Sequence, residues 1–355
     1  MRAYGVTYDT GFRSGGTTTH EPFDPGTVRR DLRIIHDDLG CDAVRVTGGD
    51  ADRLETAARH AADAGLEVWY SPFTNGLTQD ELMAFIADAA GRAERLRGEG
   101  ARVVLLTGSE ISLFTSGFLP GDSLEDRLGL LADPARLRAA LPGLPARVNT
   151  FLGRAVAAAR ERFGGPIGYA SLPFEGVDWT PFDLIATDAG YRDATTANGF
   201  REGLRAQVAR GKPFAVTEFG CVTYRGAADL GGRGDSVIAW DERARPRLTS
   251  AVTRDEDEQA RYVRELLDIY DEEGADTAFV NTFARRDLPT SPEPDRDFDV
   301  GSFGIVKILE GGRTGSAYPG MPWEPKAAFH ALTEYGRARR AARNGVPDDR
   351  LAWWA

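Results

Sequence analysis

The sequence is poor in the residues that build disulfide frameworks, zinc sites and lysine-based active sites. Its 355 residues include two cysteines, four histidines and three lysines. Two cysteines cannot form a disulfide framework, so we expect free thiols. The histidines show neither an HxH nor an HExxH spacing, which argues against a zinc hydrolase. We therefore expect no metal and no cofactor.

Long apolar runs and positive charge are also scarce. No stretch of about 18 apolar residues is present, so we expect no membrane-spanning helix. The first residues contain a single arginine and no long apolar run, which predicts no secretory signal and a cytoplasmic protein. The formal net charge of −11 opposes binding to nucleic acid or to an anionic membrane. We expect a small-molecule substrate and a monomer or homodimer.

Short apolar runs are spaced along the whole chain. They read as buried parallel strands because they are continuously apolar rather than alternating. The eight predicted strands cover residues 3–8, 43–47, 67–72, 103–107, 167–171, 184–187, 214–217 and 277–281.

Helical patterns separate these runs. The main predicted helices cover residues 27–39, 51–64, 78–97, 144–163, 199–209 and 255–273. Eight alternating units predict an α/β fold, a single (β/α)₈ TIM barrel over residues 1–340, with a C-terminal extension at 341–355 packing on it. An open doubly wound sheet is the alternative, but no GxGxxG motif follows the first run.

Four connections stand out in this pattern. Residues 172–183 are too few for a full crossover helix, so either a single helical turn serves there or the count of eight strands is wrong. Long segments rich in Gly, Pro and Asp follow strands four, seven and eight, at 111–134, 222–254 and 284–322. In a barrel they lie at the carboxyl ends of the strands, where active sites are built.

Two glutamates directly follow strongly apolar strands. Glu110 follows the fourth strand and Glu218 ends the seventh. Carboxylates at the mouth of a barrel have no core role, so they are the candidate catalytic residues. The other candidates, expected to bind substrate, are Asp9, Arg45, Tyr70, Ser109, Glu175, Asp188, Tyr191 and Asn281.

A pair of carboxyl groups across one mouth suits glycoside hydrolysis. One must be protonated to give its proton to the leaving oxygen, and the other must be ionised to attack the anomeric carbon. Arg45, in the second strand, is placed to hold one of the two ionised. The alternative is that Arg45 only neutralises a buried acid inside the barrel.

Several segments, in the same order, resemble the clan A glycoside hydrolases of bacteria, which are retaining (β/α)₈ enzymes. CDAVRV at 41–46 resembles their second strand with its arginine, and KPFAVTEFG at 212–220 resembles the seventh strand with its nucleophile. VDWTPFDLI at 177–185 resembles the short connection into strand six. SFGIV at 302–306 and WEPKAAFHAL at 323–332 resemble the closing segments.

The resemblance implies Glu218 as nucleophile, Glu110 as general acid/base and Tyr191 as a hydrogen-bond partner of the nucleophile. The sequence departs from the family at two positions. Ser109 stands where the family has an asparagine that binds the sugar 2-hydroxyl, and Asn281 begins a segment where the family has a tryptophan floor.

The leading hypothesis is a hydrolase: a retaining glycosidase or transglycosidase acting on a glycoside or polyhydroxylated compound. A second is a biosynthetic enzyme of secondary metabolism with the same barrel and acids, acting on a natural product or a non-sugar. A third is a non-catalytic carbohydrate-binding or phage-defence-associated barrel.

Overall fold

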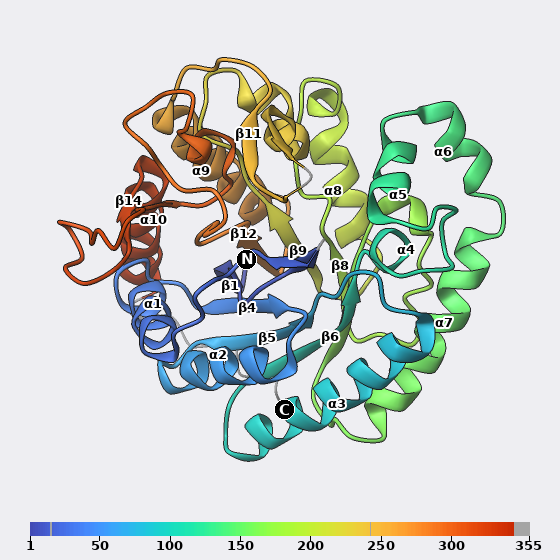
Figure 1. The fold of residues 1–355 in the computed structure, drawn as a ribbon. Coiled ribbons are helices and arrows are strands. Elements are labelled where there is room, and N and C mark those ends of the chain that lie inside the picture. The colour runs from blue at the N-terminus through green and yellow to red at the C-terminus, as the bar shows by residue number, and fades with distance from the viewer. Residues whose placement is uncertain (15, 242, 344–355) are drawn as a thin grey trace.

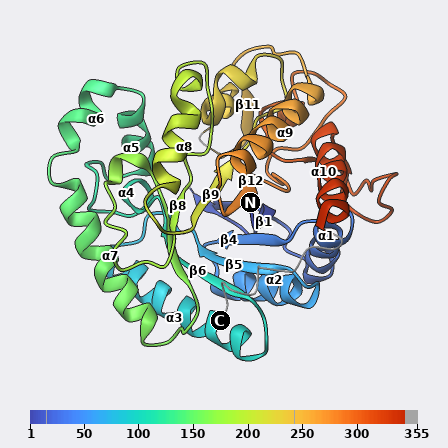
Figure 2. The same ribbon diagram turned by 180° about the vertical axis from the view of Figure 1, so that it is seen from behind.

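The computed structural model describes residues 1–14, 16–241 and 243–343. Within them, eight parallel strands close into a barrel in the order β1-β12-β9-β8-β7-β6-β5-β4, and helices surround it (Figures 1 and 2). The barrel strands are β1 (Ala3–Asp9), β4 (Ala43–Gly48), β5 (Glu67–Pro72), β6 (Val103–Ser109), β7 (Ile167–Ser171), β8 (Ile185–Thr187), β9 (Phe214–Phe219) and β12 (Thr277–Val280). The prediction of a (β/α)₈ barrel with these eight strands is confirmed.

Helices cover the outside of the barrel. They are α1 (Pro25–Asp37), α2 (Ala51–Asp63), α3 (Gln79–Gly98), α4 (Ile111–Phe114), α5 (Leu124–Leu131), α6 (Pro134–Ala140), α7 (Leu144–Arg160), α8 (Phe200–Val208), α9 (Glu256–Glu272) and α10 (Ala327–Arg343). Most begin at a side-chain cap, such as the capping box that Thr78 and Glu81 form at the start of α3.

Short elements complete the chain. Two-stranded antiparallel sheets are formed by β2 (Arg13–Ser14) with β3 (Thr17–Thr18), β10 (Ile238–Trp240) with β11 (Pro246–Leu248), and β13 (Val306–Ile308) with β14 (Trp323–Pro325). The 3₁₀ turns are η1 (Pro173–Glu175), η2 (Ala197–Gly199), η3 (Ala227–Asp229), η4 (Gly231–Val237) and η5 (Phe298–Gly301). The turn η1 supplies the single helical turn expected between β7 and β8.

The barrel strands are buried on both faces, which explains their continuous hydrophobicity. In β4, Ala43 belongs to a small core inside the barrel, whereas Val44 and Val46 belong to the larger core between strands and helices. Arg45 therefore points inward, because side chains alternate along a strand. The same alternation decides which residues can reach the barrel mouth.

The last helix closes the fold beside the first. In Figures 1 and 2, α10 lies next to α1. A side chain at Gly336 would collide with the backbone oxygen of Leu39 and with the Tyr4 hydroxyl, so only glycine permits this close approach. The helix runs past the predicted domain boundary at 340. Of the predicted extension at 341–355, residues 344–355 lie outside the described part of the chain.

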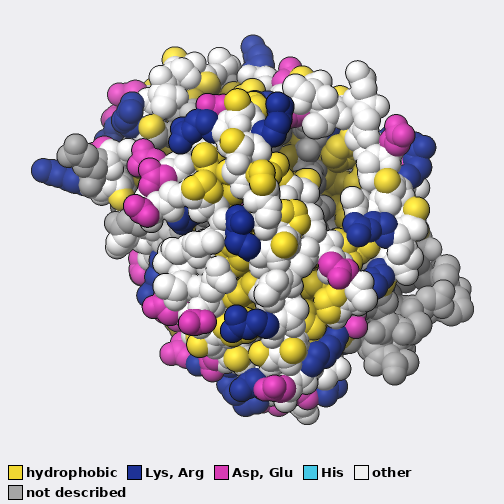
Figure 3. Space-filling view, turned by 90° about the vertical axis from the view of Figure 1, so that its right-hand side faces the viewer, with side chains coloured by type: hydrophobic (Ala, Val, Ile, Leu, Met, Phe, Trp, Pro, Cys, Tyr) yellow, Lys and Arg dark blue, Asp and Glu magenta, His cyan; other side chains and the backbone are white. Residues whose placement is uncertain are grey.

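Two further sequence-based expectations concern the whole chain. Cys41 and Cys221 are free and buried, as expected. Within the ranges described, no helix combines the length and the apolar character that crossing a bilayer requires. The face that carries α5, α6 and α7 mixes hydrophobic with charged side chains (Figure 3).

Candidate active site

Arg45 joins the candidate residues into one buried network below the barrel mouth. Its Nη1 donates to Asp188 Oδ1 at 2.7 Å and to Glu218 Oε1 at 3.1 Å. Its Nη2 donates to Ser109 Oγ at 3.0 Å and to Asp188 Oδ2 at 3.3 Å, and Nε donates to Ser71 Oγ at 3.1 Å. The guanidinium group is fully buried. It therefore positions two carboxylates from two different strand ends.

Glu218 is held from both sides of its carboxyl group. While Arg45 binds Oε1, the Tyr191 hydroxyl donates to Oε2 at 3.3 Å and Asn281 Nδ2 donates to the same oxygen at 3.2 Å. Asn281 Nδ2 also donates to the Tyr191 hydroxyl at 2.8 Å. These contacts fix one carboxyl rotamer at the mouth, where 13% of the side chain remains exposed.

The electrostatics of Glu218 differ from the sequence-based expectation. Burial and the negative charge of Asp188 raise the pKa of Glu218 to about 8, against the opposing effects of Arg45 and of hydrogen bonds. The contact between Arg45 and an acid that we predicted is present. Its effect on the Glu218 pKa is outweighed by burial and by the negative charge of Asp188.

Glu110 occupies a strained position at the start of α4. Its backbone lies in the left-handed region, with φ of 46° and ψ of 43°, which costs a non-glycine residue about 1–2 kcal/mol. The residue is partly exposed. Burial, followed by the charges of Asp188 and Glu218, raises the pKa of Glu110 well above its usual range. No described residue forms a hydrogen bond with its carboxyl group, which is therefore free for a ligand.

Glu175 supports the turn that carries Glu110. This fully buried carboxylate accepts hydrogen bonds from the Ser112 backbone N–H at 3.0 Å, the Leu172 backbone N–H at 2.8 Å and the Tyr169 hydroxyl at 2.8 Å. The Tyr169 hydroxyl in turn accepts from the Ile111 backbone N–H at 2.9 Å. Glu175 thus ties η1 to α4 and is not placed to bind substrate.

We expect Glu175→Ala to lower the free energy of unfolding by about 2–4 kcal/mol, because it leaves buried donors unpaired. Denaturant unfolding followed by circular dichroism measures this change. Glu161→Ala is the matched control, since the Glu161 side chain is 71% exposed, and we expect its effect to stay within about 0.5 kcal/mol. Equal stability of the two variants would contradict a supporting role for Glu175.

Three more residues that we expected to bind substrate have other partners. The buried Ser109 donates to Asp188 Oδ2 at 2.5 Å, so the serine hydroxyl and both oxygens of Asp188 are already engaged. Asp9 accepts from the Gly11 backbone N–H at 2.8 Å and from the Thr19 hydroxyl, and so organises its own loop.

Tyr70 lies on the other face of its strand. It is fully buried in the core between strands and helices, and the charges acting on its hydroxyl come from α2 and α3. Tyr70 therefore lies on the side of β5 that faces the helices and not the barrel interior. On β5 the inward residues are Trp69 and Ser71, and Ser71 makes the contact with Arg45. Strand alternation, counted from Arg45 across the sheet, was the signal that identifies Ser71.

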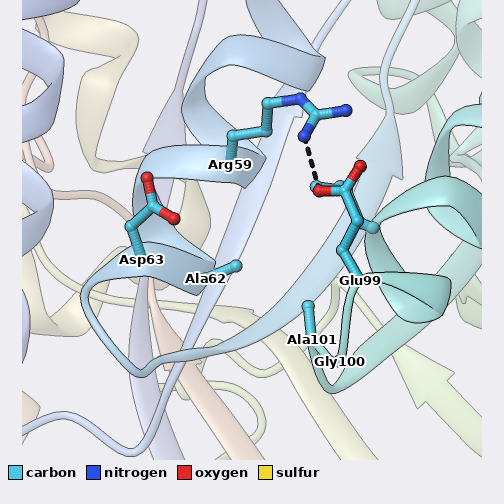
Figure 4. Close-up of a pocket in the computed structure, with 7 residues that line it drawn as sticks. Arg59, Ala62, Asp63, Glu99, Gly100 and Ala101 are labelled. Carbon is cyan, nitrogen blue, oxygen red and sulfur yellow. Dashed lines mark hydrogen bonds and ion pairs between the residues drawn. The ribbon is translucent and has the colours of Figure 1, made fainter.

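A surface cavity lies at the opposite end of the barrel. It has a volume of about 240 Å³ and is lined by the ends of α2 and α3, with Arg59 and Glu99 in a 2.6 Å ion pair (Figure 4). Its lining residues precede β5 and β6 in the chain, whereas Glu110 follows β6 and Glu218 lies at the carboxyl end of β9. The cavity is therefore separate from the mouth. In the described ranges, no cluster of three or more His, Cys, Asp or Glu residues has the geometry to hold a metal ion.

No protein-family model matches the chain, and no curated protein matches its sequence. Among solved structures, a complex of a GH113 β-1,4-mannanase has a TM-score of 0.57 at 15% identity, covering 94% of this chain and 98% of that chain. The GH113 β-mannanase AaManA from Alicyclobacillus acidocaldarius, in complex with ManMIm, has a TM-score of 0.58 at 15% identity, covering 94% and 96%.

A third neighbour is the β-glucuronidase of Parabacteroides merdae, with a TM-score of 0.53 at 14% identity. It covers 95% of this chain and 36% of the longer neighbour. At these identities the likeness shows a shared (β/α)₈ fold. The resemblance to clan A glycoside hydrolases is confirmed at that level.

Proposed function

We propose that the protein is a retaining glycoside hydrolase or transglycosidase, with Glu218 as nucleophile and Glu110 as general acid/base. The observation that carries the proposal is the contrast between the two carboxyl groups. Glu218 is fixed by Arg45, Tyr191 and Asn281, whereas the carboxyl group of Glu110 has no hydrogen-bond partner among the described residues, and burial and the neighbouring acids raise its pKa. A fixed nucleophile and a free acid suit the two halves of glycoside cleavage.

In the first step, a Glu218 oxygen attacks the anomeric carbon while the bond from that carbon to the leaving oxygen breaks. Glu110 gives its proton to the leaving oxygen and becomes a carboxylate. The product is a neutral glycosyl ester on Glu218. In the second step, water or an acceptor hydroxyl attacks the anomeric carbon, returns a proton to Glu110 and releases Glu218 as a carboxylate.

The supporting side chains keep Glu218 in position for in-line attack. Tyr191 and Asn281 bind one carboxyl oxygen, and Arg45 binds the other, so one rotamer is preserved between the two steps. The mannanases among the structural neighbours make a D-mannoside the first substrate class to test. The biosynthetic and non-catalytic alternatives predict no covalent sugar on Glu218.

Trapping of the glycosyl-enzyme tests the proposal directly. The protein is incubated with 2-deoxy-2-fluoro-glycosyl fluorides of D-mannose, D-glucose and D-galactose, because fluorine at C2 slows both steps and fluoride is a good leaving group. We expect intact mass spectrometry to show one added fluorosugar, and peptide mapping to place it on Glu218.

Two variants control the trapping. Glu218→Gln should take up no label, and Glu161→Gln, altered at a surface position, should be labelled like the wild type. Labelling at another residue, or none with any of the three fluorides, would count against the proposed function.

A further inference from the structure

Asp188 is a third carboxylate in the site, and the two-step reaction above assigns it no role. Its side chain is completely buried, and both oxygens are engaged by Arg45 and by Ser109. It therefore cannot touch a substrate. Arg45 in turn has two carboxylate partners, Asp188 at 2.7 Å and Glu218 at 3.1 Å. One buried positive charge is thus shared between two acids.

We propose that Asp188 is a positioning residue that acts as the permanent counter-charge of Arg45, so that Glu218 can become a neutral glycosyl ester without leaving the guanidinium group unpaired. This inference rests on the proposed function of Glu218. It extends that function by assigning the charge balance of the site to a residue outside the reacting pair.

The charges before and after glycosyl transfer support this role. With Glu218 ionised, Arg45 faces two negative charges, so the group carries one excess negative charge. When Glu218 forms the ester, that excess disappears and Arg45 remains paired with Asp188. Without the Asp188 charge, the same step would convert a balanced pair into a lone buried cation, which is costly in a protein interior. Asp188 therefore favours the ester over the free carboxylate.

Among the groups that face Glu218, Asp188 supplies the negative charge that opposes Arg45. Arg45 approaches from β4, Asp188 and Tyr191 follow β8, Glu110 follows β6 and Asn281 follows β12. Tyr191 is neutral, since burial raises its pKa well above the usual value, and Asn281 carries no charge. Removing the charge of Asp188 would therefore leave burial as the main effect opposing the pull of Arg45 on Glu218.

The test is a ¹³C NMR titration of the protein labelled at glutamate side-chain carboxyl carbons. The signal of Glu218 is assigned by its disappearance in Glu218→Gln. We expect the Glu218 pKa to fall by about 1 unit or more in Asp188→Asn, and to stay near the wild-type value in Asp188→Glu, which keeps the charge. An unchanged Glu218 pKa in folded Asp188→Asn would overturn the proposal.

A second measurement applies if Asp188→Asn does not fold. The Glu218 titration is then repeated on Asp188→Ser, which also lacks the charge and has a smaller side chain. We expect the same decrease in the Glu218 pKa. An unchanged Glu218 pKa in this variant would overturn the proposal.

A kinetic measurement compares the rates at which the wild type and Asp188→Asn are labelled by the fluorosugar that traps the wild type. At pH 9 we expect labelling of Asp188→Asn to be slower by about tenfold or more, which corresponds to one unit of pKa. Neither titration needs a substrate. Absence of labelling in the wild type would therefore reject the proposed function alone, whereas equal labelling rates together with unchanged titration would reject the role of Asp188 alone.

Discussion

Glu218→Gln should lose glycoside hydrolysis on the order of 10⁴-fold or more in kcat/KM, because an amide cannot form the glycosyl ester. Glutamine has nearly the same shape as glutamate, and its amide oxygen can still accept a hydrogen bond from Arg45. The loss should therefore arise from the chemistry and not from a collapsed site. Release of a chromogenic aglycone by wild type and variant measures the ratio.

Two controls separate chemistry from folding. Thermal unfolding should show Glu218→Gln at least as stable as the wild type, since it removes a buried group that can ionise. Glu161→Gln should keep wild-type kcat/KM, because this side chain is exposed on the surface. Full hydrolysis by a folded Glu218→Gln variant would rule out Glu218 as the nucleophile.

The loss of activity in Glu110→Gln should depend on how much the leaving group needs to be protonated as it departs. For an alkyl or sugar leaving group, loss of the proton donor should lower kcat/KM by about 10²–10⁴-fold. For a dinitrophenyl leaving group, which departs as an anion, the decrease should be much smaller. The comparison uses two glycosides of the same sugar, measured by product release at one pH.

The pattern of these two losses distinguishes an acid from a residue that only shapes the site. A purely structural change would affect both glycosides equally, and that result would remove Glu110 from the proposed role. Glutamine at position 110 must adopt the same left-handed backbone, so a melting curve close to that of the wild type is the required control.

The barrel could be predicted from sequence because its strands are buried on both faces. Continuous apolar runs such as those in β4 and β9 cannot be confused with the alternating strands of a sheet exposed to water. The two glutamates stood out because each follows such a run directly. The short helices α5 and α6, within and just beyond the segment that follows β6, were not predicted, since their apolar faces are small.

Contacts between distant segments could not be predicted in the same way. Ser109 and Asp188 are 79 residues apart, and only the closed barrel brings the serine hydroxyl within 2.5 Å of the carboxylate. The supporting contact of Glu175 with the Ser112 backbone could not be predicted, because Ser112 lies in another segment. The position of a polar residue at a strand end was predictable, but the group it would pair with was not.

Burial of Glu218 has a consequence for the whole molecule. Its carboxyl group has an ordinary value of 4.5 and a pKa of about 8 in the folded chain, so between these pH values the native protein binds more protons than the unfolded one. The free energy of unfolding therefore decreases as the pH rises through that interval. Glu218 thus contributes stability in mild acid, where the nucleophile is protonated, and that contribution is lost under the alkaline conditions in which the nucleophile is ionised.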